Sequence, residues 1–166
     1  MTALSIEEIF RGTAFGEFLI TFAVAMLPII ELRGAIPLGV SIGLGPWTSM
    51  IAAILGNMLP VPFIILFIRR VFAWMRKKSR RLDNVVGRIV LKAEGKWDKV
   101  HKYQFFGLMV LVAIPLPGTG AWTGALIAAL IDMRLRNAMV SIFLGVLIAG
   151  ILVLGITYGF STIFLA

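Results

Sequence analysis

The sequence has no cysteine, a single histidine and only eight acidic residues. Disulfides, thiol chemistry and thiolate zinc sites are therefore excluded, and one histidine cannot build a histidine-rich metal cluster. Of the 166 residues, 14% are charged, well below the roughly 25% typical of soluble domains. Hydrophobic residues make up 60%. This balance predicts one membrane domain, residues 1–166, and disfavours a soluble enzyme.

Most of the positive charge lies in one connecting segment, residues 69–102. It holds twelve Lys and Arg residues and three acids, so its net charge of +9 (12 − 3) exceeds the +8 of the whole chain. A basic block of this kind can bind nucleic acid, but hydrophobic segments flank this one on both sides. The positive-inside rule therefore predicts that it lies in the cytoplasm beside the membrane, with no nucleic-acid partner.

The second part of this connector has the pattern of an amphipathic helix. Apolar side chains recur at helical spacing at Val85, Val86, Ile89, Ala93, Trp97 and Val100. The pattern is typical of a helix lying in the membrane interface, and a solvated linker is the alternative. The bases expected to contact anionic lipid are Arg76, Lys77, Lys78, Arg80, Arg81, Arg88, Lys92, Lys96 and Lys99.

Four hydrophobic segments surround the connector, at residues 18–44, 47–68, 103–131 and 138–165. A helix needs about 20 residues to cross the roughly 30 Å hydrocarbon core, so the second and fourth can span it. The first and third are interrupted. The interruptions contain Pro28, Glu31, Arg33, Gly34 and Pro37 in the first, and Pro115, Pro117, Gly118 and Gly120 in the third.

Each interrupted segment is either one kinked span or a re-entrant hairpin. The arms before the breaks, Leu19–Ile30 and Tyr103–Ile114, would rise only about 18 Å. If the third segment is a hairpin, the loop with Arg134 and Arg136 returns to the cytoplasm, where the positive-inside rule places arginines. The charge pattern thus predicts a hairpin followed by a span, twice, in opposite orientations, with both termini outside.

The two halves also carry similar small-residue patterns after their breaks, Gly39–Gly43 and Gly120–Gly124. Such spacing lets membrane helices pack closely. The fold predicted is therefore all-α, with two inverted repeats of a re-entrant hairpin and a transmembrane helix. Repeat one covers about 17–68, the cytoplasmic connector 69–102 and repeat two about 103–165.

Glu31 and Arg33 are the acid and base that lie within the hydrophobic half-segments, away from their ends. An ionisable residue at membrane depth is a candidate functional group because its charge is costly there. Arg33 suits a phosphate or carboxylate, and Glu31 suits a proton-coupling site. The alternative is that the two side chains only neutralise each other, or hold the second hairpin in place.

The second break is rich in turn residues, and a half-helix is expected to begin after it. The N–H groups of such a helix attract anions, whereas Pro and Gly in this position can serve the turn alone. Asn57 is a polar residue in the middle of the second apolar segment. We expect it either to line a cavity or to form a hydrogen bond with a backbone carbonyl that a proline leaves without a partner. The candidate substrate or coupling residues are Glu31, Arg33, Gly34, Pro37, Asn57, Pro115, Pro117, Gly118, Thr119, Gly120, Trp122 and Thr123.

Three stretches together resemble the small multidrug export protein family. They are Pro28 to Gly39, Gly56-Asn57, and Pro115 to Gly124. The resemblance covers nearly the whole chain and implies an integral membrane transporter. The family is also distantly similar to the DedA-like superfamily, which implies two re-entrant hairpins and lipid-carrier movement. Second hairpins of that superfamily carry an arginine soon after the Pro-Gly turn, and residues 119–130 have none.

The sequence therefore predicts a secondary transporter that exports a small amphipathic substrate, coupled to protons or another ion. Translocation of an anionic lipid such as a polyprenyl phosphate, held by Arg33 and the Pro117-Gly118 turn, is one alternative. A membrane scaffold with a lipid-binding basic loop is another. No enzyme activity, cofactor or metal is expected. We expect the protein to form a homodimer and to lie in a prokaryotic plasma membrane.

Overall fold

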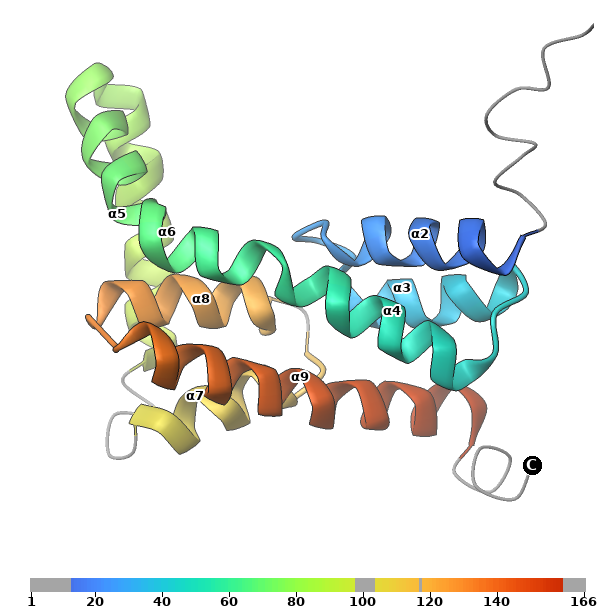
Figure 1. The fold of residues 1–166 in the computed structure, drawn as a ribbon. Coiled ribbons are helices and arrows are strands. Elements are labelled where there is room, and N and C mark those ends of the chain that lie inside the picture. The colour runs from blue at the N-terminus through green and yellow to red at the C-terminus, as the bar shows by residue number, and fades with distance from the viewer. Residues whose placement is uncertain (1–12, 98–103, 117, 160–166) are drawn as a thin grey trace, which may run out of the picture. The chain divides into compact units, whose positions relative to one another are not determined.

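The structure is a computed structural model that describes residues 13–97, 104–116 and 118–159. Within these residues every regular element is a helix, which confirms the all-α fold class. The helices are α2 (Ala14–Ala25), α3 (Glu31–Ser41), α4 (Pro46–Met58), α5 (Pro60–Lys78), α6 (Arg80–Trp97), α7 (Gln104–Ala113), α8 (Ala121–Leu130) and α9 (Leu135–Tyr158) (Figure 1).

Two helical stretches are long and apolar enough to cross a bilayer. Pro46–Lys78, which is α4 followed by α5, has 33 residues, and α9 has 24. Both exceed the roughly 20 residues that a span requires. By contrast α2, α7 and α8 have 12, 10 and 10 residues and rise only about 15–18 Å each. These lengths and compositions are compatible with an integral membrane protein.

The described chain forms two compact units. Unit one takes the residues up to Leu59 and those from Leu147 onward, and unit two takes Pro60–Val146. Both long stretches contribute to both units, because Pro46–Lys78 begins in unit one and α9 begins in unit two. The predicted repeats at 17–68 and 103–165 follow chain order instead, and that subdivision stays a prediction.

In unit one, α2 and α3 form a helical hairpin, and α4 packs against both (Figure 1). Helix α2 begins at an N-cap, where Thr13 Oγ1 accepts a hydrogen bond from the Gly16 N–H at 3.3 Å. Helix α4 begins with Pro46, whose missing N–H is harmless in a first turn. Gly56 of α4 lies so close to the Phe22 carbonyl of α2 that no side chain fits there.

Unit two repeats this local arrangement. Helices α7 and α8 form a hairpin, and Ser141 Oγ of α9 donates a hydrogen bond to the Phe105 carbonyl of α7 at 2.6 Å. Gly145 of α9 lies against α7 as Gly56 lies against α2. A Cβ at Gly145 would be 2.7 Å from the Met109 carbonyl oxygen. In both units, therefore, a glycine lets the long helix approach the backbone of the first hairpin arm.

The turns that follow α3 and α8 have the same hydrogen bonds. In each turn, two successive N–H groups donate to carbonyls three and five residues earlier, which is the Schellman pattern at a helix C-terminus. The residue with positive φ is Gly43 (+120°) in unit one and Asp132 (+57°) in unit two. The bonds run from Gly43 to Val40, Leu44 to Gly39, Asp132 to Ala129, and Met133 to Ala128, at 3.0–3.4 Å.

Arg69 of α5 closes the C-terminus of α8. Its Nε donates to the Ala129 carbonyl at 2.6 Å and its Nη2 to the Leu130 carbonyl at 3.2 Å. The same guanidinium forms an ion pair with Asp132. A cation at a helix C-terminus satisfies unpaired carbonyls and favours the negative end of the helix dipole. Arg69 therefore lies at the same end of unit two as the turn after α8.

The connector forms helix α6, which packs on α5 and α8 within unit two. The prediction of a helix in this region is confirmed for Arg80–Trp97, and residues 98–102 lie outside the described part of the chain. Val86 is fully buried, whereas Val85 and Leu91 are exposed. The location of α6 at a membrane interface stays a prediction.

The first hairpin differs from the prediction in two places. Its first arm is Ala14–Ala25 and not Leu19–Ile30, because the Thr13 cap starts the helix early and residues 26–30, with Pro28, form turns. Pro37 does not interrupt the segment but lies inside α3, where the flanking residues stay helical. The arm predicted at Tyr103–Ile114 is confirmed to within a residue at each end, as Gln104–Ala113.

Candidate functional site

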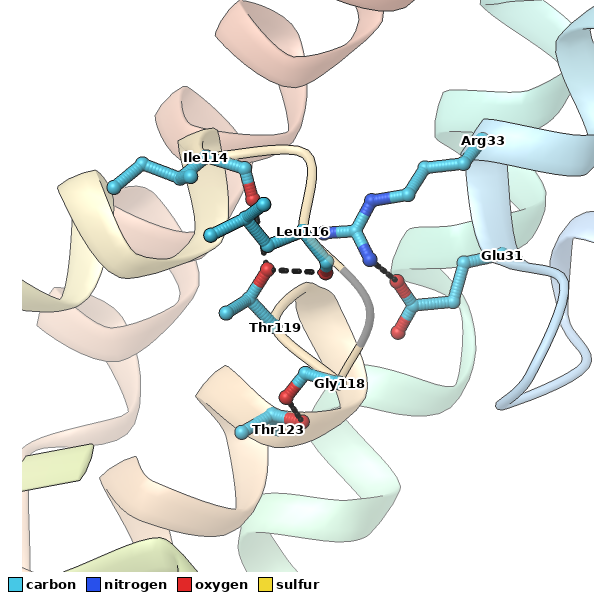
Figure 2. Close-up of polar contacts among 7 residues, drawn as sticks. All are labelled: Glu31, Arg33, Ile114, Leu116, Gly118, Thr119 and Thr123. Carbon is cyan, nitrogen blue, oxygen red and sulfur yellow. Dashed lines mark hydrogen bonds and ion pairs between the residues drawn. The ribbon is translucent and has the colours of Figure 1, made fainter. Parts of the chain in front are cut away.

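Glu31 and Arg33 open α3 at the first break and form an ion pair. Arg33 Nη1 lies 3.8 Å from Glu31 Oε2 (Figure 2). The Glu31 side chain is 5% exposed and that of Arg33 21%. A carboxylate this deeply buried requires a compensating partner, and the guanidinium supplies one.

The backbone at Glu31 is unusual for a residue with a side chain. Its φ is +50°, a left-handed conformation that costs a residue other than glycine about 1–3 kcal/mol. Residues two apart do not face each other on a regular helix. The positive φ turns Glu31 off the regular helical path, and the carboxylate reaches Arg33. Strain of this kind concentrates at functional sites.

Two further predicted residues lie close to the pair on α3. Gly34 packs on the turn before the helix, since a Cβ there would lie 2.5 Å from Ile30 Cγ2. Pro37 has no N–H to donate to the carbonyl of Arg33, one turn earlier in the helix. The first turn of α3 is therefore bonded differently from a regular helix at the point where its charged residues lie.

The second break forms a compact turn in unit two, held by two threonine hydroxyls (Figure 2). Thr119 Oγ1 lies 2.7 Å from the Ile114 and the Leu116 carbonyls, and Thr123 Oγ1 donates to the Gly118 carbonyl at 3.0 Å. Backbone carbonyls of the turn therefore engage the protons of both hydroxyls.

The other predicted residues of this break lie around that turn. Gly120, with φ +129°, precedes α8 as its N-cap, and Pro115 and Trp122 are half-buried. Pro117 lies outside the described residues. The prediction that the two breaks share one cavity stays a prediction.

Asn57 lies at the end of α4 in unit one and is completely buried. Neither its amide nitrogen nor its amide oxygen has a hydrogen-bond partner among the described residues. The predicted alternative in which Asn57 bonds a freed carbonyl is therefore not observed in the described chain.

The sequence-based prediction did not select two other buried polar side chains of unit one. Thr21 and Ser49 are both fully buried, and Gly39 lies between them. Thr21 Oγ1 donates to the Glu17 carbonyl at 2.8 Å, whereas Ser49 Oγ has no partner in the described chain. Ser49 precedes Asn57 by eight residues, so both lie on one face of α4, and this spacing is the signal that could have identified Ser49.

The basic residues predicted at a lipid interface are exposed where their side chains are described. Lys78 lies over the Trp74 ring at 4.5 Å, and Arg76 Nε lies 3.7 Å from Asp83 Oδ1. Lys99 lies outside the described residues, and the side chains of Lys92 and Lys96 are not described. The exposed set is Arg76, Lys77, Lys78, Arg80, Arg81 and Arg88.

The described residues contain no group of three or more His, Asp or Glu side chains that could hold a metal ion. Unit one contributes a buried acid–base pair, Glu31 and Arg33, together with neutral hydroxyl and amide groups. Such a set can bind and release charged groups.

Comparison with known proteins identifies a family for the chain but does not test its site residues. No curated protein and no solved structure matches the chain. One family model matches residues 31–152, from Glu31 at the start of α3 into α9, and its description is "Putative small multi-drug export protein". The match covers well over half of the chain. It includes the first break from Glu31 onward, Asn57, the basic connector and the second break. The chain therefore belongs to this small multidrug export family.

Proposed function

We propose that the protein is a secondary transporter that exports a small amphipathic substrate and couples this export to protons or another ion. The observation that carries the proposal is the buried Glu31–Arg33 ion pair at the break of an apolar segment. Its backbone is strained at Glu31, where a structural role alone would favour glycine. The family description supports a transporter broadly, and a transporter accounts for the chain better than an enzyme.

The proposed topology has two re-entrant hairpins. The four hairpin arms have 12, 11, 10 and 10 residues, so none is long enough to span a core of about 30 Å. In unit two, the contacts of Arg69 bring the turn after α8 to the end of the unit where the basic residues of α5 begin. If those residues are cytoplasmic, Arg134 and Arg136 are cytoplasmic too, as the positive-inside rule favours.

A repeated architecture is supported by correspondences at one fixed separation in the sequence. Gly43 and Asp132 occupy the same position in the two Schellman turns. At the same separation, Pro46 and Leu135 begin the long helices, and Gly56 and Gly145 approach the first hairpin arms. Two hairpins entering from opposite sides make this an inverted repeat, the arrangement of many secondary transporters.

In this proposal Glu31 carries the coupling charge. Its carboxylate is held by Arg33 in the structure, and an incoming cation or a proton competes with Arg33 for it. Release of Arg33 then changes the charge that the first hairpin presents to a substrate. The experiment below identifies the coupling ion, because it shows which gradient drives transport, and it also shows the direction in which the substrate moves.

A second candidate is translocation of an anionic lipid such as a polyprenyl phosphate. The observation in its favour is the 21% exposure of Arg33, since a guanidinium that is not fully enclosed can bind a phosphate in a bidentate manner. The exposed bases of α5 and α6 would draw anionic lipid to the same protein at about 1 kcal/mol each. Helices α7 and α8 themselves carry no basic residue, so a phosphate would depend on Arg33.

The test uses the full-length protein in liposomes, with the dye ethidium as a small amphipathic probe. We expect a pH or Na⁺ gradient to drive dye movement, and Glu31→Gln to slow it at least tenfold. Asp132→Asn is the matched control, since it also removes an acid at a hairpin but leaves the first break intact.

A parallel measurement follows a fluorescent lipid with a phosphate head group. Gradient-driven dye flux that is the same in wild type and Glu31→Gln would contradict the proposed coupling site. Absence of dye flux, together with movement of the phosphate lipid that is lost in Arg33→Gln, would support the second candidate instead.

A further inference from the structure

The buried residues of α2, α3 and α4 include a set spaced four residues apart, most of them with short side chains. Residues four apart lie on one face of a helix, so each helix presents a row to the others. All of these residues are buried. The rows are Thr21 and Ala25 on α2; Glu31, Ala35 and Gly39 on α3; and Ser49, Ala53 and Asn57 on α4.

The contacts of Gly39 fix how these rows align. A Cβ on Gly39 would lie 2.6 Å from Ser49 Oγ and 2.7 Å from Thr21 Oγ1, so both hydroxyls point at this part of α3. Helices α3 and α4 run in opposite directions through a short connection. Glu31 lies eight residues before Gly39 and Asn57 eight residues after Ser49. On regular helices each would lie about 12 Å from this contact, toward the same end.

Several polar atoms in this interior make no hydrogen bond within the described chain. Ser49 Oγ and both polar atoms of Asn57 are completely buried without a hydrogen-bond partner in the described chain. Thr21 Oγ1 uses its proton on the Glu17 carbonyl, so its lone pairs remain for another group. Buried polar groups are almost always satisfied in proteins by protein atoms, water or a ligand.

Unit two provides an internal comparison at the corresponding positions. Counted from the two Schellman turns, Ser49 corresponds to Ala138, Asn57 to Val146 and Glu31 to Gly120. All three counterparts are buried, as their partners are. The same turn and helix packing therefore forms without a hydroxyl, an amide or a carboxylate. The polar groups of unit one are not required for this architecture.

We propose that the interior of α2, α3 and α4 is a path for a small monovalent cation, either Na⁺ or a proton carried on water. The cation has one position at the oxygens of Thr21 and Ser49 and a second, about 12 Å further on, at those of Asn57 and Glu31. This assignment rests on the proposed function, since it locates the coupling ion of the transporter. Hard cations select oxygen ligands, and all four side chains offer oxygen. The site has one carboxylate, Glu31, and Arg33 already lies beside it. One such negative charge suits a monovalent cation and not a divalent one.

The helices of unit one carry few charged or titratable groups. Among the described residues of α2, α3, α4 and the second half of α9, they are Glu17, Glu31, Arg33 and Tyr158. Glu17 lies at the opposite end from Glu31, where its Oε1 would be 2.9 Å from a Cβ on Gly43. It therefore flanks the end of the interior at which Thr21 and Ser49 lie, and it is placed to attract a cation to that end.

The test measures charge movement in the full-length protein, reconstituted in liposomes on a solid-supported membrane, with no transport substrate present. A Na⁺ jump at constant pH and a pH jump without Na⁺ are applied separately. We expect one of the two jumps to give a transient current in wild type, which identifies the ion. Ser49→Ala and Asn57→Val, which copy unit two, should reduce that current at least tenfold at a half-saturating concentration.

Ser141→Ala is the matched control because Ser141 is an equally buried serine whose hydroxyl has a partner. It should leave the current unchanged. Currents of wild-type size in both Ser49→Ala and Asn57→Val would overturn the proposed site. So would a wild-type protein that gives no current with the Na⁺ jump and none with the pH jump.

The dye assay separates this inference from the proposed function. Ion-driven dye export that persists in Ser49→Ala and Asn57→Val would leave the export function standing and overturn the cation site. A current that depends on Ser49 and Asn57, in a protein that moves no dye, would support the cation site and contradict export of amphipathic substrates.

Discussion

Units one and two share their turns and close helix contacts, but they differ in what fills the interior. In unit one, Ser49 and Asn57 carry polar atoms without partners in the described chain, whereas Ala138 and Val146 occupy the corresponding positions of unit two. At the start of the second arm, unit one has Glu31 with a positive φ and unit two has Gly120. These residues of unit one lower local stability, and the similar scaffold of unit two forms without them. Their presence in only one unit therefore indicates selection for function.

In unit two, by contrast, several polar side chains form hydrogen bonds that hold the fold together. Ser141 bonds the Phe105 carbonyl, Thr119 and Thr123 bond carbonyls of the second break, and Arg69 bonds the end of α8. The comparison teaches that polar residues in an apolar chain can be sorted by whether the fold uses them. Substitutions in either unit test this division.

The largest effect is expected at the two close helix contacts. Gly56→Val and Gly145→Val would drive a side chain into the carbonyls of Phe22 and Met109. Each should destabilise the protein by about 3 kcal/mol or more, since backbone cannot move aside as a side chain can. Both variants should lose monodisperse protein in size-exclusion chromatography. Gly87→Ala, which has open space around it, should not. Loss at only one of the two glycines would break the analogy between the units.

Placing the amide of unit one into unit two should be the next largest effect. Val146→Asn buries a polar group where the structure has an apolar one, and should destabilise by about 2 kcal/mol. Thermal unfolding in detergent measures this, with Val146→Ala as the control for lost volume. An Asn variant more stable than the Ala variant would indicate that unit two also accommodates polar groups.

Arg69→Ala removes two hydrogen bonds to the end of α8 and the ion pair with Asp132. Because the Arg69 side chain is 45% exposed, we expect a loss of only about 1–2 kcal/mol in thermal unfolding. Arg70→Ala, at the exposed neighbouring residue, serves as the control. Equal effects of the two substitutions would show that the α8 contacts do not hold the second hairpin.

The smallest effect isolates the backbone at Glu31. Glu31→Gly and Glu31→Ala both remove the carboxylate from Arg33, and they differ in their tolerance of φ +50°. The Gly variant should be more stable than the Ala variant by about 1 kcal/mol, and both should lose coupled transport. Equal unfolding temperatures would contradict the positive φ.

Hydropathy and charge in the sequence were sufficient to predict the helical class, the two long apolar helices and the helical connector. The breaks were located too, but not their boundaries. The composition of the segment 18–44 does not reveal its helix ends. It shows neither the cap of α2 at Thr13, which precedes the segment, nor that α3 accommodates Pro37.

Of the site, Glu31, Arg33 and Asn57 could be predicted because charged and amide groups are rare in apolar segments. Ser49 and Thr21 do not stand out in the same way, since serine and threonine are ordinary residues of membrane helices. Only the eight-residue spacing from Asn57 points to Ser49. What distinguishes them is that both face Gly39, a contact between helices that the sequence does not specify. The left-handed backbone of Glu31 is likewise a result of the fold, and so is its contact with Arg33.

The most direct test of functional selection in unit one is thermal unfolding of the double variant Ser49→Ala, Asn57→Val beside wild type. The measurement is made in the same detergent, at one pH and without Na⁺. Removing buried polar groups without partners should raise stability by about 1–3 kcal/mol. A higher unfolding temperature in the double variant is the predicted result. An unfolding temperature below that of wild type would show that the fold itself depends on these polar groups, and would contradict the account.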